Sequence, residues 1–221
     1  MSDVRLPGPH TRVRRLPEKA VYDAAKVHAI LDATFLCHVA GVVDGLAVAL
    51  PTLYVREGDT LYLHASRSNA LLRSALAAGR LSLSATIFDG LRLARSGFES
   101  SIAYRSVVVV GTPAEVTDVA QKRRIVEGFV DAITPGRASE VRPLSEREAA
   151  LTLVVALAID EASAKVSRGP TDDDTEDADL PIWAGTVGAR LVYGPVEPSR
   201  AGAMAQGIDL PPSVRRLLEN E

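Results

Sequence analysis

The sequence predicts a mainly β protein of the α+β kind, a small antiparallel barrel of six to seven strands with flanking helices. Three observations predict it. Short segments alternate apolar and polar residues at period two, tight turns separate them, and strands and helices do not alternate strictly along the chain. Strict alternation is typical of a parallel sheet, so antiparallel pairing is the expected arrangement.

The composition is that of a globular protein with one main core. The chain has 221 residues, of which 47% are hydrophobic and 24% charged, and this length predicts one domain or at most two. The net charge of -3 argues against nucleic acid as the main partner. No apolar run reaches membrane-spanning length, and a single cysteine suits a reducing compartment, so we expect a cytoplasmic protein that does not enter a membrane.

The first elements are a helix and two strands. Residues 1–15 hold several arginines and no apolar segment, which predicts a flexible N-terminal arm rather than a secretory signal. A helix is expected to begin at Pro17, because proline suits the first helical position. Strands are expected at residues 35–39 and 46–56, and Pro51 places the second at an edge or a bulge because proline has no N–H to donate.

The segment 61–73 is the central one for function. Leu61 and Leu63 alternate with polar residues and predict a strand, and a leucine-rich helix follows. Ser66 or Ser68 is the expected helix cap, so backbone N–H groups and the positive end of the helix dipole point into the turn. Together with Arg67 the turn suits a phosphate, although an ordinary capped helix beside a solvated arginine explains the same residues.

The second half of the chain predicts further strands and helices. Residues 81–88 alternate as a strand, and Asp89 with Gly90 predicts a hairpin that returns through residues 91–95. A buried strand is expected at 107–110, a helix at 119–133, a capping box at 145–148 and a central strand at 151–159. The acidic segment 172–179 reads as solvated loop, and the last residues as a tail with a short basic helix.

Several kinds of chemistry have no sequence signature. The chain has no Walker loop, no glycine-rich dinucleotide motif and no nucleophile elbow. Cys37 lies in an apolar strand and reads as core rather than as a nucleophile, and no general acid or base is evident, so the catalytic residues stay unknown. No metal site is expected, because metal-ligand spacing is absent among the four histidines: His10, His28, His38 and His64.

The order of these elements resembles the pyridoxamine 5′-phosphate oxidase-like superfamily of FMN-binding split β-barrels, in particular its nitroimidazole-reductase and flavin-nucleotide-binding branch. The resemblance covers residues 16–194, which makes residues 1–15 an arm and 195–221 a C-terminal tail. It implies a six- to seven-stranded split barrel that forms a homodimer with FMN at the subunit interface, acting on a small-molecule substrate.

The resemblance also implies the residues of an FMN site. Residues 50–52 would lie along the isoalloxazine ring, residue 64 beside the ribityl chain, and residues 66–69 around the phosphate. Residues 105 and 106 would approach the flavin in the dimer, residue 165 would lie on the substrate side or near flavin N1, and residue 183 would pack from the other subunit. The implied set is Leu50, Pro51, Thr52, His64, Ser66, Arg67, Ser68, Asn69, Arg105, Ser106, Lys165 and Trp183.

Two departures from the oxidase bear on the substrate. The oxidase carries an Arg-Lys pair in the phosphate turn, whereas here Ser68 follows Arg67, and the late arginine-histidine segment that grips pyridoxal phosphate is not recognisable. We therefore expect an FMN-dependent oxidoreductase of a planar or heteroaromatic substrate and not of vitamin B6. The alternatives are a flavin store or sensor, a deazaflavin protein, and a haem-binding split barrel with His64 or His38 as axial ligand.

Overall fold

The computed structural model describes residues 6–171, 173–197, 199 and 207–219, so Asp172 and parts of the predicted arm and tail lie outside the described residues. Seven strands within these ranges have seven residues or more, which confirms the predicted six to seven: β2 (Leu36–Val43), β3 (Leu46–Glu57), β4 (Thr60–Ser66), β5 (Leu81–Leu93), β6 (Ser101–Gly111), β8 (Thr152–Ala158) and β9 (Glu161–Ser167). Three shorter strands are β1 (Ala20–Val21), β7 (Pro113–Glu115) and β10 (Gly185–Gly188).

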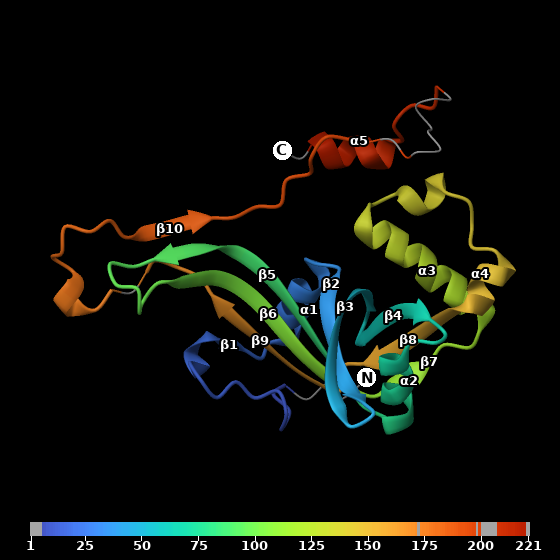
Figure 1. Cartoon of the computed structure of the whole chain (residues 1–221), viewed down its shortest axis with the longest axis horizontal. Helices are drawn as coiled ribbons and strands as arrows, with labels where there is room; N and C mark the ends of the chain where they lie inside the picture. The colour runs from blue at the N-terminus through green and yellow to red at the C-terminus, as the bar shows by residue number, and fades with distance from the viewer. Residues whose placement is uncertain (1–5, 172, 198, 200–206, 220–221) are drawn as a thin grey trace.

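All of these strands join one antiparallel sheet in the order β1-β9-β6-β5-β2-β3-β4-β8-β7, with β10 added to β5 (Figure 1). The point where the barrel splits lies on β3. Its residues from Leu46 to Leu53 pair with β2, whereas Tyr54 to Glu57 pair with β4. Pro51 therefore lies in the half of β3 that has no pairing to β4, which confirms the predicted edge position.

The helices are α1 (Ala24–Asp32), α2 (Ala70–Ala78), α3 (Val119–Ile133), α4 (Glu146–Leu151) and α5 (Pro212–Glu219). Two predictions need correction. Pro17 begins only a 3₁₀ turn, Pro17–Lys19, and α1 begins after Asp23, whose side chain accepts the Lys26 N–H. The cap of α2 is Asn69, which accepts the Leu72 N–H, because the serines lie too early in the turn. The capping box of Ser145 and Glu148 is confirmed.

The hairpin predicted at Asp89 and Gly90 is also wrong. β5 continues to Leu93 through a bulge between Phe88 and Gly90, and β6 begins only at Ser101. Gly90 has φ 148° and pairs with Gly188 of β10, and a Cβ at Gly90 would lie 2.2 Å from the Val187 carbonyl oxygen. At the bulge, β10 pairs with β5 as a third strand. The ends of β5 and β6 and the whole of β10 thus form a three-stranded extension that projects from the barrel (Figure 1).

The two faces of the sheet differ. The inner face holds the main core, which includes Cys37, Val39, Tyr54, Leu83 and Val109. The outer face is covered by α3 at one end only, where a second cluster forms: Tyr62, Val116, Ile125, Phe129 and Val154. The outer face of β2, β5 and β6 stays open in the single chain, and Leu36, Phe88 and Val108 on it are 50%, 49% and 39% exposed.

The chain ends are partly packed on this frame. Residues 6–15 of the predicted arm run against β9, where Thr11 is buried and the His10 N–H donates to Glu161 at 2.9 Å. After β10 the chain crosses back over the barrel as an extended strap, residues 189–197, and α5 then lies near α3 (Figure 1). Across the described ranges, no helix has the length and apolarity needed to cross a membrane.

Candidate functional site

The turn between β4 and α2 is the best-defined polar site of the barrel. The Ser66 and Ser68 hydroxyl oxygens lie 2.9 Å apart, and the Ser68 N–H donates to the Ser66 hydroxyl. The Asn69 N–H donates to the Ser66 carbonyl at 3.0 Å. The turn is therefore closed by its own hydrogen bonds, and it presents two exposed hydroxyls and the first-turn N–H groups of α2.

Two arginines flank this turn, and one carboxylate joins them. Arg67 Nη2 and Arg73 Nη1 each lie 3.2 Å from an oxygen of Glu115, which comes from β7. Arg73 Nε also donates to the Arg67 carbonyl at 2.9 Å. Arg67 remains 45% exposed, so part of its guanidinium faces solvent beside the two serines. Two positive charges and one negative charge leave the turn with a net positive charge, which suits an anion.

His64 lies two residues before the turn, on the outer face of β4. Its ring meets Phe129 of α3 edge-on, with centroids 4.3 Å apart. Burial lowers the pKa of His64, which keeps the imidazole neutral. Its Nδ1 is buried and has no hydrogen-bond partner among the described residues. A polar atom buried in this way is costly unless another group completes it.

The predicted residues on β3 and β6 divide between the two faces. Pro51 pairs with His38, and Ser84 pairs with His38 and with Val108, so these side chains form a row on the open outer face. Ser106 and Lys165 pair with each other in the next row of the same face. The structure therefore brings five polar or ring-bearing positions together on one surface: Pro51, His38, Ser84, Ser106 and Lys165.

The neighbouring predicted residues face the other way. Leu50 pairs with Val39 and Thr52 with Cys37, both of which belong to the core. Arg105 forms a twofold ion pair with Asp89, whose second partner is Arg168 at 3.2 Å. The hydrogen bond from Arg105 holds the pKa of Asp89 below its ordinary value. A ligand on the outer face thus meets Pro51 and Ser106 rather than the side chains on either side of them.

Lys165 and Trp183 lie apart from the turn. Lys165 Nζ donates to the Arg15 carbonyl at 3.1 Å, so it is held beside the N-terminal segment. Trp183 is 67% exposed on the loop before β10 and packs over Gly185. Among the described residues, no hydrogen bond or ion pair joins either of them to Ser66–Asn69. Across the described part of the chain, no group of three or more His, Cys, Asp or Glu side chains is arranged to hold a metal ion.

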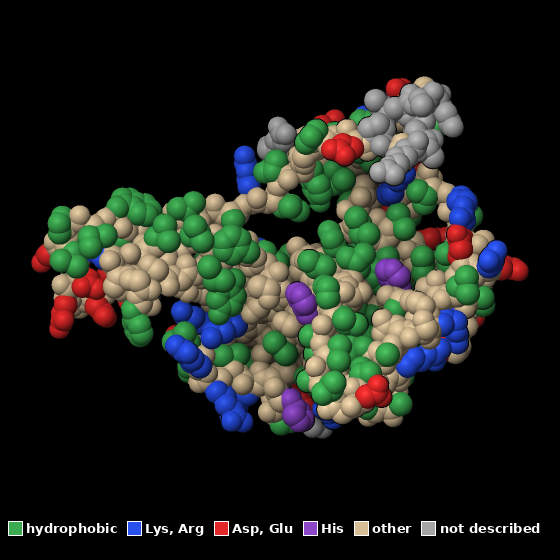
Figure 2. Space-filling view, in the orientation of Figure 1, with side chains coloured by type: hydrophobic (Ala, Val, Ile, Leu, Met, Phe, Trp, Pro, Cys, Tyr) green, Lys and Arg blue, Asp and Glu red, His purple; other side chains and the backbone are tan. Residues whose placement is uncertain are grey.

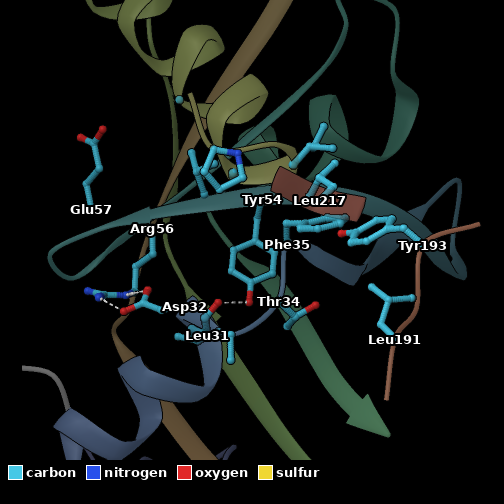
Figure 3. Close-up of a pocket in the computed structure, with 16 residues that line it drawn as sticks. Leu31, Asp32, Thr34, Phe35, Tyr54, Arg56, Glu57, Leu191, Tyr193 and Leu217 are labelled. Atoms are coloured by element: carbon cyan, nitrogen blue, oxygen red, sulfur yellow. Dashed lines mark hydrogen bonds and ion pairs between the residues drawn. The ribbon is translucent and has the colours of Figure 1, made fainter. Parts of the chain in front are cut away.

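Sequence reasoning missed one cavity altogether. A space of about 580 Å³ lies between the end of α1, the second half of β3, and α3, and Leu191, Tyr193 and Leu217 of the C-terminal segment line its remaining side (Figure 3). Its walls are mostly apolar and aromatic: Leu31, Phe35, Tyr54, Val55, Ala132, Ile133, Leu191, Tyr193 and Leu217. Five segments far apart in the chain contribute to it, so no local pattern could have revealed it.

The fold and the polar turn define the class, a split antiparallel barrel of the pyridoxamine 5′-phosphate oxidase type. The family model described as pyridoxamine 5′-phosphate oxidase matches residues 23–166, which is more than half of the chain. The chain belongs to this family, and the resemblance identified in the sequence is confirmed. No curated protein matches the chain.

Three solved structures illustrate what the chain is similar to. The flavocytochrome Anf3 from Azotobacter vinelandii is 35% identical, with 95% of this chain and 97% of that one covered and a TM-score of 0.87. An FAD and haem binding protein from Mycobacterium smegmatis is 37% identical, with coverages of 90% and 97% and a TM-score of 0.83. A putative 5-nitroimidazole antibiotic resistance protein from Bacteroides thetaiotaomicron shares the fold at 18% identity, with coverages of 66% and 86% and a TM-score of 0.57.

Proposed function

We propose that this chain is a flavin-binding protein and that the turn from Ser66 to Asn69, with Arg67, receives a flavin phosphate. The observation that carries the proposal is the buried, unpartnered Nδ1 of His64 on the strand that leads into this turn. A hydroxyl or phosphate oxygen of a flavin chain is a suitable partner for this atom, because a neutral imidazole nitrogen either donates or accepts. A flavin is also in keeping with the flavocytochrome from Azotobacter vinelandii and the FAD and haem binding protein from Mycobacterium smegmatis, which are 35% and 37% identical to this chain.

The turn from Ser66 to Asn69, with Arg67, suits either flavin nucleotide. FMN is the flavin expected from the sequence, and the FMN half of FAD carries a phosphate at the same point of its chain. Charge-assisted hydrogen bonds from Arg67 and neutral ones from Ser66 and Ser68 would hold that group. Because the relative from Mycobacterium smegmatis is an FAD and haem binding protein, FAD is the alternative outcome of the same experiment.

We also propose a homodimer that forms through the open outer face, with the flavin between the subunits. The apolar residues on this face are too exposed for an isolated chain, since side chains such as Leu36 and Val108 have no covering element. A twofold dimer would bury the same face of both chains. Pro51, Ser106 and Lys165 lie on this face and would then line a shared site. Trp183, on the loop before β10, would reach that site from the partner subunit.

A flavin supplies hydride and electron transfer when it is bound, and the protein supplies orientation and exclusion of water. We propose an oxidoreductase that acts on a small planar or heteroaromatic compound; the alternative is a flavin store without a reaction of its own. The departure at Ser68 from the Arg-Lys pair of the oxidase argues against vitamin B6 as the substrate.

Haem is the second candidate, alongside the flavin. The Azotobacter relative is a flavocytochrome and the Mycobacterium smegmatis relative an FAD and haem binding protein, and each aligns with 90% or more of this chain. His64 and His38 are the axial ligands proposed from the sequence, and both lie on the outer face of the sheet. His38 is exposed and His64 retains an unpartnered ring nitrogen, so both rings are chemically able to bind iron.

The visible absorption spectrum of freshly purified protein tests both cofactors. A two-banded flavin spectrum supports the first proposal, and an added Soret band supports the second. Titration of the protein with FMN, FAD and riboflavin then identifies the flavin, because riboflavin lacks the phosphate that the Ser66–Asn69 turn would hold. A protein that is colourless and retains none of these compounds would contradict both proposals.

A further inference from the structure

The cavity at the end of β3 is separate from the phosphate turn. Its β3 residues, Tyr54 to Glu57, pair with the first half of β4, whereas the turn Ser66–Asn69 follows the end of β4. Its volume of about 580 Å³ lies within the range of roughly 300–1,000 Å³ that is usual for small-molecule sites. The space-filling view shows a hollow between the C-terminal segment and the barrel (Figure 2). The cavity therefore has the size and the position of a second, independent site.

Aromatic rings form much of the cavity wall. Phe35 and Tyr54 line it from the barrel, and Tyr193 lines it from the strap on the opposite side (Figure 3). Aliphatic side chains complete the wall: Leu31, Val55, Ile133, Leu191 and Leu217. Aromatic rings stack on another flat ring or meet its edge, and aliphatic groups contact it through dispersion. These walls suit a flat aromatic ligand.

The charged groups at this cavity are already paired. Arg56 donates to both carboxylate oxygens of Asp32, and Glu57 is paired with Arg124. Among the described residues that line the cavity, no cation or carboxylate is left to neutralise a charged ligand. Because an unpaired charge is costly to bury, the ligand is expected to be neutral.

One hydroxyl at the cavity can still donate a hydrogen bond. The Thr34 hydroxyl oxygen accepts the Leu36 N–H at 3.3 Å, which leaves the hydroxyl proton for a ligand. A neutral acceptor such as a ketone oxygen is a suitable partner for this proton.

Polar contacts fix the C-terminal wall of the cavity. The Ser213 N–H donates to Glu140 at 3.0 Å, and Arg216 donates to the Pro135 carbonyl at 2.9 Å, so α5 is anchored to the segment that follows α3. Leu191 of the strap is nevertheless 76% exposed. The wall is thus held without closing on the barrel, and a ligand in between would cover apolar surface on both sides.

We propose that this cavity is a binding site for a neutral, planar aromatic compound, held between the strap on one side and β3 with α3 on the other. The aromatic walls select a flat ring, and the paired charges select a neutral one. The inference does not rest on the proposed flavin site, because the cavity and the phosphate turn have no described residue in common.

Gly128 gives a direct test because it faces the cavity from α3. A Cβ placed there has no described neighbouring atom within 4 Å, so a larger side chain would enter the empty space. Gly128→Leu fills part of the cavity and keeps the helix, because leucine is a better helix former than glycine. Gly128→Ala is the matched control, since it changes the helix in the same sense and leaves most of the cavity open.

The full-length chain would be dialysed to equilibrium against 2-acetylnaphthalene and, separately, against 2-naphthoate. The two compounds have the same fused rings and nearly the same shape, but only the naphthoate is charged. The wild type should bind the ketone at least about tenfold more tightly than the naphthoate, a difference of about 1.4 kcal/mol. Naphthoate binding as tight as that of the ketone, or a wild type that binds neither compound, would overturn the inference.

The variants locate the bound ring. Gly128→Leu is expected to weaken binding of the ketone by about tenfold, whereas Gly128→Ala binds it as the wild type does. Leu191→Ser combined with Tyr193→Ser removes two apolar contacts of the strap, leaves α3 intact and should also weaken binding. Equal binding by the wild type and Gly128→Leu would overturn the location.

FMN added to the same samples separates this site from the proposed flavin site. FMN should not displace the ketone, and flavin content should be the same in all variants. Displacement by FMN would place the aromatic ring at the flavin site and overturn the inference. A protein that binds the ketone but no flavin would contradict the proposed function alone.

Discussion

Arg67 lies with its Nη2 3.2 Å from Glu115 Oε1, and the other oxygen of the same carboxylate holds Arg73. Glu115 thus holds two positive charges side by side at the start of α2. It lies 48 residues (115 − 67) after Arg67 in the sequence. The arrangement keeps the arginines oriented before a ligand arrives. Both arginines are more than two-fifths exposed, so salt and water screen the ion pairs and leave the guanidinium groups able to exchange partners.

The first prediction concerns Arg67. Arg67→Ala should weaken FMN and FAD binding by roughly ten- to 100-fold, because a hydrogen bond to a charged group contributes about 1.5–3 kcal/mol. Riboflavin has no phosphate and should bind the variant as it binds the wild type. Arg124→Ala is the control, since Arg124 is an exposed arginine paired with Glu57 away from the turn. An equal loss for riboflavin and FMN would show that Arg67 does not contact the phosphate.

The second prediction uses the burial of His64. Burial lowers the pKa of the folded imidazole below its ordinary value of 6.5, so the folded state binds fewer protons than the unfolded chain as the pH falls below 6.5. The stability contributed by neutral His64 is therefore complete above pH 6.5 and is lost as the pH falls toward the lowered pKa. His64→Gln should destabilise the protein less at pH 5.5 than at pH 7.5.

Thermal unfolding at the two pH values measures this difference. His38→Gln is the control, because it introduces the same side chain on the same sheet and leaves His64 intact. The control should keep the wild-type dependence on pH. If His64→Gln keeps it as well, the imidazole is not the group that titrates.

The third prediction concerns Cys37. Burial raises the pKa of this thiol to about 12, and the side chain is only 1% exposed. The thiolate is the reactive form, so the folded protein should react very slowly with a thiol reagent at pH 8 and should react fully once unfolded in guanidinium chloride. Rapid modification of the native protein would place Cys37 near the surface and reopen a nucleophilic role.

The fourth prediction concerns the anchor of the C-terminal helix. The carboxylate of Glu140 accepts hydrogen bonds from the Ser213 N–H at 3.0 Å and from the Ser213 hydroxyl, and these bonds lower its pKa. A lowered pKa means that the contact stabilises α5 above the ordinary value of 4.5 and is lost as the pH falls below it. Glu140→Gln should release α5 at neutral pH.

Limited trypsin digestion reports the release, because Arg215 and Arg216 lie within α5. Mass spectrometry should detect faster loss of the last residues in Glu140→Gln and in Ser213→Ala than in the wild type. Glu146→Gln, an acidic residue at the start of α4, serves as the matched control. Identical digestion of all four proteins would show that Glu140 does not anchor the helix.

Local signals predicted much of this molecule. The helix at Val119–Ile133 and the capping box at Ser145 follow from residue spacing within one element, and both are present. The edge position of Pro51 could be predicted for the same reason, since a missing N–H restricts where a strand pairs. The helix after Arg67 could also be predicted, although its cap is Asn69 and not one of the two serines.

What could not be predicted depends on partners distant in the chain. The dipeptide Asp89–Gly90 is equally compatible with a hairpin and with a bulge, so it does not distinguish the two. Here it forms a bulge, and β10 pairs with Gly90 on the side away from β6. Glu115 reaches Arg67 only through the fold, because the two residues belong to separate elements of the chain. The alternation that places Leu50 and Thr52 on the face opposite Pro51, and Arg105 on the face opposite Ser106, is by contrast a local property of each strand.

The pairing of β1 with β9 has a consequence for how the protein is made. Ala20 lies opposite Lys165, so this pair joins residues 145 positions apart (165 − 20). At about 5–20 residues per second, a ribosome needs roughly 7–30 s to synthesise the segment between them. The first strand therefore waits on the nascent chain until β9 has emerged, and the barrel closes only after most of its other strands are available. Chaperones that bind exposed β segments have that interval in which to act.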